Sequence, residues 1–459
     1  MEKGNKNLVL GLVVVTSFIT PFLGASVNIA LPAMGDHFGM SAVTLSWVAM
    51  SYLLSSAVFL VPMGKLADRV GRVRIFIYGT IIVSLSSFSC AWATSTGMLL
   101  ALRVIQGIGS SMMFGTNMAI ITSAFPPGQR GKVIGINVTS VYLGLSLAPV
   151  LGGLMTHHLG WQSIFLFIGP LGLAVALTGL LLLKLKRSEP VTEPFDYRGS
   201  MIYVLSMSAL MYGLSTLPDT LAIVLSVTGA AGLLLFGVIE MKIPHPVFDM
   251  QLLLKNRLFA LSNLAAMINY ATTFAVTFLL SLYLQYIKGL TAREAGLLLM
   301  VQPVMMALVA SFSGRMSDRV RPGVLASLGL AVICAGLVLL AFVGATTSTS
   351  YLLFTLVIMG TGFGLFSSPN TNAVMSSVGK KDLGIASATV ATMRLTGQMT
   401  SMAVATLVIH IFIGQASITE SNHTQFLHTL PVVFGIFIPL SLLGIWASLA
   451  RDRKPSMAG

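Results

Sequence analysis

Eleven residues between two long apolar stretches concentrate charge in an otherwise apolar chain. They run Gly64-Lys65-Leu66-Ala67-Asp68-Arg69-Val70-Gly71-Arg72-Val73-Arg74 and predict a short charged hairpin between two membrane helices. A carboxylate at a helix end can pair with an arginine and with the N-terminus of a neighbouring helix. Asp68 is therefore a candidate latch residue for the cytoplasmic side. The alternative is that the basic residues only fix the topology. The other candidate latch residues of this loop are Gly64, Arg69, Gly71 and Arg72.

A weaker copy of this loop, Ser313-Gly314-Arg315-Met316-Ser317-Asp318-Arg319-Val320-Arg321-Pro322-Gly323, recurs in the second half of the chain. It again lies between two apolar stretches, and Asp318 is its candidate latch residue. A charged loop repeated at the same kind of position predicts a chain built from two related helical bundles.

Two arginines, Arg103 and Arg394, fall inside apolar stretches. A charge at the centre of a membrane helix costs about 2.5–3.5 kcal/mol, so each needs a partner or water. We favour positions facing a central cavity, although Arg103 lies near a helix end and could instead extend to the membrane surface. Candidate cavity or substrate contacts also include buried amides, each of which is more often a helix–helix hydrogen bond. They are Asn28, Gln106, Asn137, Asn269 and Gln398.

Small residues recur every four positions in the fifth apolar stretch. Gly144, Ala148 and Gly152 have this spacing and Gly153 is adjacent, so two backbones can approach closely here, and Pro149 removes one backbone hydrogen bond and permits a bend. Ordinary close packing and a bending helix both explain this pattern.

None of the 14 acidic residues falls at mid-span, so the residues themselves predict no membrane-embedded proton site. A cavity with arginines and no acids favours an anionic or zwitterionic amphiphile.

The composition places these residues in a membrane protein. The chain is 55% hydrophobic and 9% charged, against about 25% charged in soluble domains. We predict an all-α polytopic protein without a disulfide and with both termini cytoplasmic. All but four of the 27 Lys and Arg then lie at cytoplasmic helix ends, as the positive-inside rule requires. The predicted spans are 8–32, 44–63, 75–95, 97–121, 133–155, 161–183, 199–216, 220–240, 258–286, 293–312, 324–344, 350–376, 384–413 and 429–450.

Eight predicted helices separate the two charged loops, where two plain six-helix halves would give six. The additional pair, 199–216 and 220–240, is joined by a short turn and predicts an αα-hairpin. One of the two segments could instead lie along the membrane surface. We predict an N-terminal six-helix bundle at 1–187, an inserted two-helix hairpin with its flanks at 188–256, and a C-terminal six-helix bundle at 257–459.

With these motifs in place, the chain resembles the fourteen-span drug:proton antiporter branch of the major facilitator superfamily. The likeness rests on the first charged loop and on four further matches, the last of which is the pair of segments that flank the inserted hairpin. It implies a first helix that closes at Pro32, a latch at Asp68 in the outward-open state, a leak-preventing fifth helix and export coupled to protons. Cation exporters of this family commonly carry an aspartate where this chain has Leu23. The four matches are Asn28–Pro32, Leu102–Gly109, Gly144–Gly153, and the flanking pair Phe195–Gly199 and Pro246–Asp249.

We therefore expect secondary active export of amphipathic small molecules, drugs included, across the cell membrane by alternating access. The alternative is transport of an endogenous anionic or lipid-like metabolite without a conventional proton site. An intramembrane enzyme would need an embedded His, Asp or Glu cluster, and only His157-His158 at a helix end comes close. No glycine-rich phosphate loop supports a nucleotide-driven pump. We expect no catalytic residue, cofactor, metal or nucleic-acid partner, and a monomer whose partners are the lipid bilayer, the substrate and protons.

Overall fold

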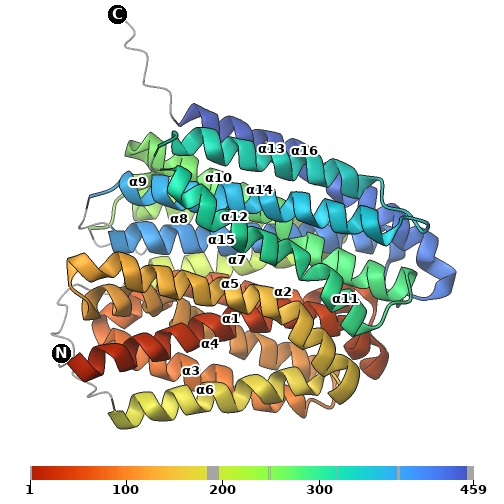
Figure 1. Cartoon of the computed structure of the whole chain (residues 1–459), viewed down its shortest axis with the longest axis horizontal. Coiled ribbons are helices and arrows are strands. Elements are labelled where there is room, and N and C mark those ends of the chain that lie inside the picture. The colour runs from red at the N-terminus through yellow and green to blue at the C-terminus, as the bar shows by residue number, and fades with distance from the viewer. Residues whose placement is uncertain are drawn as a thin grey trace, which may run out of the picture. The chain divides into compact units, whose positions relative to one another are not determined.

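The computed structural model describes residues 3–182, 196–244, 246, 248, 250–317, 319–379 and 383–451, and this part of the chain is helical without a strand (Figure 1). The helices up to residue 240 are α1 (Lys3–Phe38), α2 (Ala42–Val70), α3 (Arg72–Ala91), α4 (Thr96–Ala124), α5 (Pro127–Leu159), α6 (Gln162–Leu182), α7 (Tyr197–Thr216) and α8 (Thr220–Glu240). The remaining ones are α9 (Met250–Lys255), α10 (Arg257–Leu282), the π-helix η1 (Tyr283–Ile287), α11 (Ala292–Leu299), α12 (Val301–Met316), α13 (Pro322–Ala341), α14 (Thr349–Ser376), α15 (Leu383–Ile413), the 3₁₀-helix η2 (Glu420–Asn422) and α16 (His423–Ala450).

Thirteen helical segments within the described residues are long and apolar enough to cross a membrane. They match thirteen of the fourteen predicted spans. The fourteenth, predicted at 199–216, forms helix α7 but does not reach the same apolarity. The all-α polytopic architecture is thus confirmed, while the cytoplasmic position of both termini stays a prediction.

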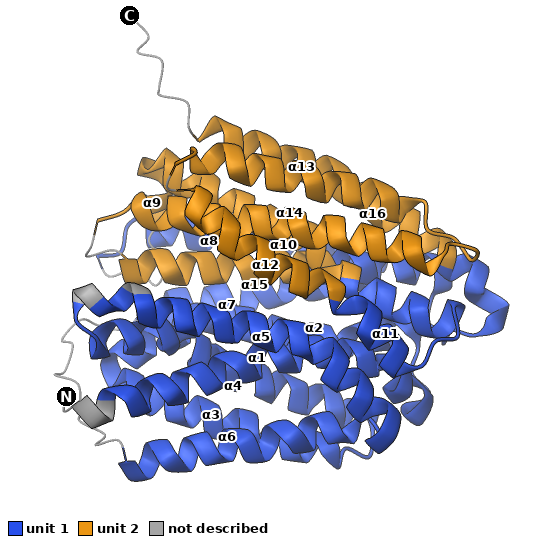
Figure 2. Ribbon diagram, in the orientation of Figure 1, with its two compact units in different colours: residues 1–248, 277–300, 402–426 blue, residues 249–276, 301–401, 427–459 orange. Residues whose placement is uncertain are grey.

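The contacts divide the chain into two compact units (Figure 2). Unit 1 comprises residues 1–248, 277–300 and 402–426, and unit 2 comprises residues 249–276, 301–401 and 427–459. The ends of α10, α15 and α16 thus belong to unit 1, whereas most of each helix belongs to unit 2. The predicted bundle boundaries after residues 187 and 256 stay predictions.

The two halves of the chain share the same serine N-cap at an equivalent helix. Ser95 caps α4 by accepting a hydrogen bond from the Met98 amide at 3.2 Å, and Ser348 caps α14 in the same way from the Tyr351 amide at 3.3 Å. A serine at this position satisfies one of the unpaired amides of the first helical turn. The fourth helix of each half therefore begins with an equivalent cap.

Reciprocal glycine pairs give stronger support for the repeat. A Cβ on Gly79 of α3 would lie 2.7 Å from the Gly109 carbonyl oxygen of α4, and one on Gly109 would lie 2.8 Å from that of Gly79. Gly329 of α13 and Gly362 of α14 show the same pair of distances, 2.7 and 2.8 Å. Only glycine permits such backbone approach, so both halves pack their third and fourth helices by the same means.

Helix α1 is longer than predicted, and the expectation that Asn28–Pro32 closes it is wrong. The helix continues through Pro32 to Phe38. Proline cannot donate to the carbonyl four residues before it, which here belongs to Asn28. The Ser281 hydroxyl donates to that carbonyl instead, at 2.8 Å, and the Gln285 amide donates to the neighbouring Ile29 carbonyl at 3.1 Å. The Ser281 bond from α10 thus replaces the one that the proline removes, and Gln285 of η1 adds a second bond to α1.

The span predicted at 293–312 is interrupted at Met300, where α11 ends and α12 begins. Pro303 explains the break, because its missing amide leaves the Leu299 carbonyl without its helical donor.

The two helices predicted at 199–216 and 220–240 form a hairpin. Gly213 of α7 lies against Ala222 of α8, and Gly229 of α8 lies against Ser206 of α7, so the two helices run antiparallel.

Candidate functional site

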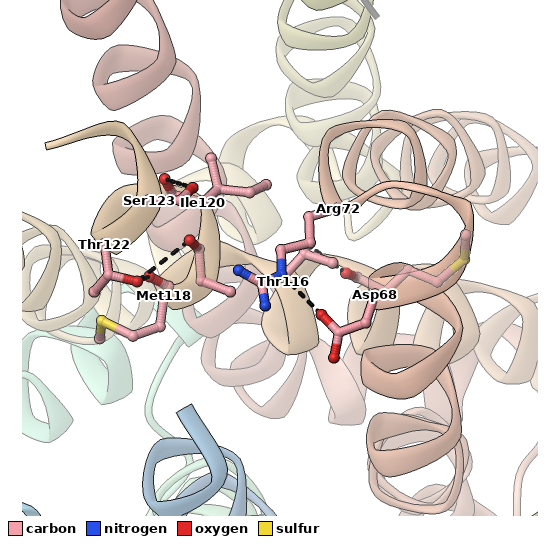
Figure 3. A network of polar contacts seen from close by, with 9 residues as sticks. Asp68, Arg72, Thr116, Met118, Ile120, Thr122 and Ser123 are labelled. Atoms are coloured by element: carbon pink, nitrogen blue, oxygen red, sulfur yellow. Dashed lines mark hydrogen bonds and ion pairs between the residues drawn. The ribbon is translucent and has the colours of Figure 1, made fainter. Parts of the chain in front are cut away.

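The first charged loop forms a tight turn between α2 and α3. Gly71 has φ 114°, a conformation that suits glycine, and its amide bonds to the Ala67 carbonyl at 2.9 Å. Arg72 begins α3, and its Nε lies 2.8 Å from Oδ1 of Asp68. Figure 3 shows the Asp68 carboxylate turned toward Arg72 across this turn. Both side chains are a little over 40% exposed, so this is a local, solvated ion pair.

The remaining latch candidates divide into a packing position and an exposed one. Gly64 lies against Gly115 of α4, whose added Cβ would come within 3.3 Å of the Gly64 backbone. A Cβ on Gly64 itself would lie 3.9 Å from the Gly115 carbonyl oxygen, an ordinary contact, so the close approach here depends on Gly115 rather than on Gly64. Arg69 is exposed. Asp318, the latch candidate of the second copy, lies outside the described residues, and the latch role of both aspartates stays a prediction.

Arg103 is fully enclosed, with 1% of its surface exposed. Its Nε donates to the Val48 carbonyl of α2 at 3.0 Å, and its Nη1 donates to Oε1 of Gln106 at 2.5 Å. The guanidinium carbon also lies 4.5 Å from the centre of the Tyr52 ring. The side chain therefore does not extend to the membrane surface. It joins α4 to α2, and Gln106 continues the network to Ser87 of α3 at 2.7 Å.

The predicted amide side chains differ in whether a hydrogen-bond partner is found among the described residues. Asn137 of α5 accepts from the Ser17 hydroxyl of α1 at 2.6 Å, and Asn117 of α4 donates to that hydroxyl at 3.1 Å. Asn137 is thus part of a helix–helix hydrogen-bond network. Asn269 of α10 is 0% exposed, and neither its Oδ1 nor its Nδ2 finds a hydrogen-bond partner within the described residues. Asn28 is 2% exposed, and its Oδ1 likewise lacks a described partner.

Arg394 of α15 is half-buried and lies in a polar cluster of unit 2. The hydroxyl of Tyr270, the residue after Asn269, hydrogen bonds with Arg394 and with Ser367 of α14. Phe363, also on α14, packs edge-on against the Tyr270 ring at 5.3 Å. One turn beyond Arg394, the side chain of Gln398 is also half-buried.

The small residues of α5 contact two different helices. Added Cβ atoms on Gly144 and Gly152 would lie 2.6 Å from the Phe18 carbonyl oxygen and 2.8 Å from Ser26 Cβ, both on α1. One on Gly153 would lie 2.4 Å from the Ala292 carbonyl oxygen of α11. From the other side, a Cβ on Gly296 would lie 2.1 Å from the Pro149 carbonyl oxygen. Helix α5 thus meets α11 backbone to backbone.

The sequence did not predict the contacts of three residues, Tyr52, Tyr270 and Glu240. Tyr52 and Tyr270 contact the two intramembrane arginines, but a tyrosine in an apolar stretch carries no signal of its own. Glu240, taken only as a helix-end residue, is 1% exposed and accepts from the Phe248 amide at 2.8 Å. The available signal was that an acid at a helix C-terminus opposes the helix dipole and needs another stabilising contact.

Comparison with known proteins identifies the family of this architecture. Residues 13–402 and 262–458 match the Major Facilitator Superfamily. The chain belongs to that superfamily. It is 30% identical over 389 residues to the riboflavin transporter RibZ of Clostridioides difficile (strain 630), covering 85% of each protein. It is therefore a multi-pass membrane transporter protein rather than an enzyme.

Other superfamily members of similar sequence are named for resistance. The multidrug resistance protein Stp of Mycobacterium tuberculosis (strain CDC 1551 / Oshkosh) is 29% identical, over 82% of this chain and 71% of Stp. The methylenomycin A resistance protein of Streptomyces coelicolor is 26% identical over 96% of this chain and 93% of that protein. Among solved structures, a bacterial homolog of the human lysosomal transporter Spinster, inward-facing and occupied, has a TM-score of 0.67 at 16% identity, covering 99% and 98% of the two chains. This last likeness concerns the fold.

Proposed function

We propose that this superfamily member is a secondary active transporter that exports amphipathic small molecules, drugs included, across the cell membrane by alternating access. Two observations in unit 2 carry the proposal: buried Asn269 of α10 has no described hydrogen-bond partner, and the next residue, Tyr270, contacts Arg394. An unsatisfied buried amide costs about 1–3 kcal/mol. A bound substrate offsets that cost by supplying the missing hydrogen bonds, while Phe363 offers an aromatic edge to its apolar part.

The proposed moving parts are the predicted bundles at 1–187 and 257–459. The contact of α5 with α11 serves as one gate, because glycines on both helices allow a tight seal without any side chain that must be disengaged. The bonds from Ser281 and Gln285 to the α1 carbonyls belong to the same gate. Asp68 acts at the opposite helix ends, where it pairs with Arg72 at the start of α3.

The proposed charge of the substrate follows from Arg394 in the polar cluster of unit 2. At an effective dielectric constant near 20, a like charge about 4 Å from Arg394 costs around 4 kcal/mol, so the cluster favours anionic or zwitterionic amphiphiles. Proton coupling rests on the family resemblance. Outside the α7–α8 hairpin, the acidic side chains that the structure describes are exposed or half-buried: Asp36, Asp68, Glu294 and Glu420.

A second candidate function is the transport of an endogenous metabolite of the same chemical kind. The likeness to RibZ favours it, since that relative is a riboflavin transporter. Riboflavin is a planar, amphipathic ring system without a permanent positive charge, which the Tyr270–Phe363–Arg394 cluster would accept.

Growth-inhibition profiling tests the proposal. A drug-sensitive strain that expresses the chain is exposed to cationic, zwitterionic and anionic amphiphiles, with riboflavin transport measured in parallel. We expect resistance to amphiphiles of at least one class, strongest for zwitterionic and anionic ones. A Gly153→Leu variant that expresses equally well should confer no resistance, because its side chain obstructs the gate. Resistance to no compound contradicts export, and riboflavin transport without resistance supports the second candidate.

A further inference from the structure

An apolar groove lies between α2 and α7 at the end of these helices that carries the first charged loop. Its volume is about 300 Å³, at the lower end of the range for ligand pockets. The residues that define its two walls are Phe59, Met63 and Leu66 of α2 and Tyr197, Met201 and Val204 of α7.

Contacts outside the groove hold α7 in place. Near the opposite end, the rings of Trp47 and Tyr212 lie 5.4 Å apart and join the two helices. The His410 ring also contacts the Leu217 carbonyl at 2.9 Å and holds the α7–α8 turn. At the level of Leu66 and Tyr197, the space between the helices is lined by apolar side chains and by Ser200.

Exposed basic residues follow the groove residues along both helices. On α2, exposed Arg69 follows the groove residue Leu66 by one turn. On α7, exposed Arg198 follows the groove residue Tyr197 directly. An apolar slot that ends in two arginines is complementary to a molecule with a hydrocarbon chain and an anionic head.

We propose that this groove binds an anionic phospholipid of the surrounding bilayer, with one acyl chain between α2 and α7 and the phosphate beside Arg198 and Arg69. A lipid is favoured over a water-soluble ligand because the walls offer only apolar area. Met201 and Tyr197 are more than 60% exposed, so the slot faces outward from unit 1, where the lipid is the solvent. Clustered basic residues at a membrane surface attract anionic lipids.

The consequence concerns the inserted hairpin. Asp68 lies two residues after Leu66 on the same helix, so a lipid in the groove contacts both the α2 segment that carries the latch and the α7 helix. The inserted hairpin thereby provides one wall of a lipid site next to the first charged loop. This inference rests on the membrane location of the chain and is independent of the substrate proposed above.

Native mass spectrometry of the delipidated whole protein tests this inference. The protein is titrated with phosphatidylglycerol or with phosphatidylcholine of the same acyl chains. We expect one phosphatidylglycerol to bind at least about fivefold more tightly than phosphatidylcholine, since each basic side chain near an anionic lipid contributes about that factor. Arg198→Gln should lower this preference by about fivefold, because Arg69 still contributes. Val204→Trp, which fills the groove, should weaken the binding of both lipids at this site.

Leu205→Trp provides the matched control, because Leu205 is the next residue of α7, is 63% exposed and does not line the groove. It should bind phosphatidylglycerol as the wild type does. Equal affinity for both lipids in the wild type would overturn the proposal, as would unchanged binding by Val204→Trp or an equal loss in Leu205→Trp. Displacement of the bound lipid by inorganic phosphate alone, or dimers in place of lipid adducts, would also overturn it.

Discussion

The interface between α5 and α11 gives the sharpest prediction, because one added methyl group must change the conformational equilibrium. In Gly153→Ala the new Cβ would lie 2.4 Å from the Ala292 carbonyl oxygen, about an ångström closer than an ordinary carbon–oxygen contact. The neighbour is backbone, so no side-chain rotation relieves the overlap. Overpacking of this kind costs about 1–3 kcal/mol. If the two helices separate during transport, that cost shifts the equilibrium toward the separated state by about 5–150-fold.

Cysteine accessibility measures this shift directly. Ser281 is 0% exposed and bonds to the Asn28 carbonyl, so a Ser281→Cys reporter should react slowly with a maleimide in the purified protein. The reporter is placed in a background without Cys90 and Cys334. Adding Gly153→Ala should raise the labelling rate by about the same 5–150-fold factor.

Gly135→Ala is the matched control for this experiment. Gly135 lies on the same helix, but an added Cβ there meets nothing within 4 Å, so the labelling rate should not change. Thermal denaturation separates gate opening from general unfolding. An unchanged rate in Gly153→Ala, or an equal increase in Gly135→Ala, would refute the assignment of this interface as a gate.

Three further predictions follow from the charged residues. Asp68→Asn should leave expression intact but slow turnover, with an effect of about 1–3 kcal/mol on the transition between states, and unchanged transport would reduce the loop to a topology signal. Arg103→Gln should lower the thermal stability of the protein, because it breaks the buried bonds to Val48 and Gln106, and an unaltered melting temperature would contradict a role in joining α4 to α2. For the topology, a cysteine at exposed Ser421 should react with an impermeant reagent in intact cells, whereas one at exposed Arg198 should react only after permeabilisation; the reverse pattern would invert the predicted orientation.

The helical architecture was predictable because long apolar runs and repeated charged loops are local properties of the sequence. The inserted hairpin is the clearest case: its second helix begins at Thr220 and ends at Glu240, as expected from the short polar turn before it. The close approach of Gly144 to α1 also followed from residue size alone. A glycine indicates that a neighbouring backbone can approach closely, whichever helix that backbone belongs to.

What could not be predicted depends on partners distant in sequence. Pro32 does not end α1, because Ser281 takes over the carbonyl that the proline leaves free, and no local pattern announces a donor that far along the chain. Arg103 was assigned a cavity-facing position, but its burial against Val48 and Tyr52 makes it a helix–helix contact in this structure. For the hairpin flanks, Phe195, Val247 and Asp249 lie outside the described residues, and that resemblance stays untested.

The most direct test of the central claim is substrate flux through purified protein in liposomes, measured for anionic, zwitterionic and cationic amphiphiles in the wild type and in Arg394→Gln. We expect saturable transport of anionic or zwitterionic compounds by the wild type. Arg394→Gln should weaken that transport and should spare or improve the transport of lipophilic cations, because removing the guanidinium removes a like-charge barrier. Strong, pH-driven transport of permanent dications by the wild type, together with indifference of every substrate class to Arg394→Gln, would contradict the account.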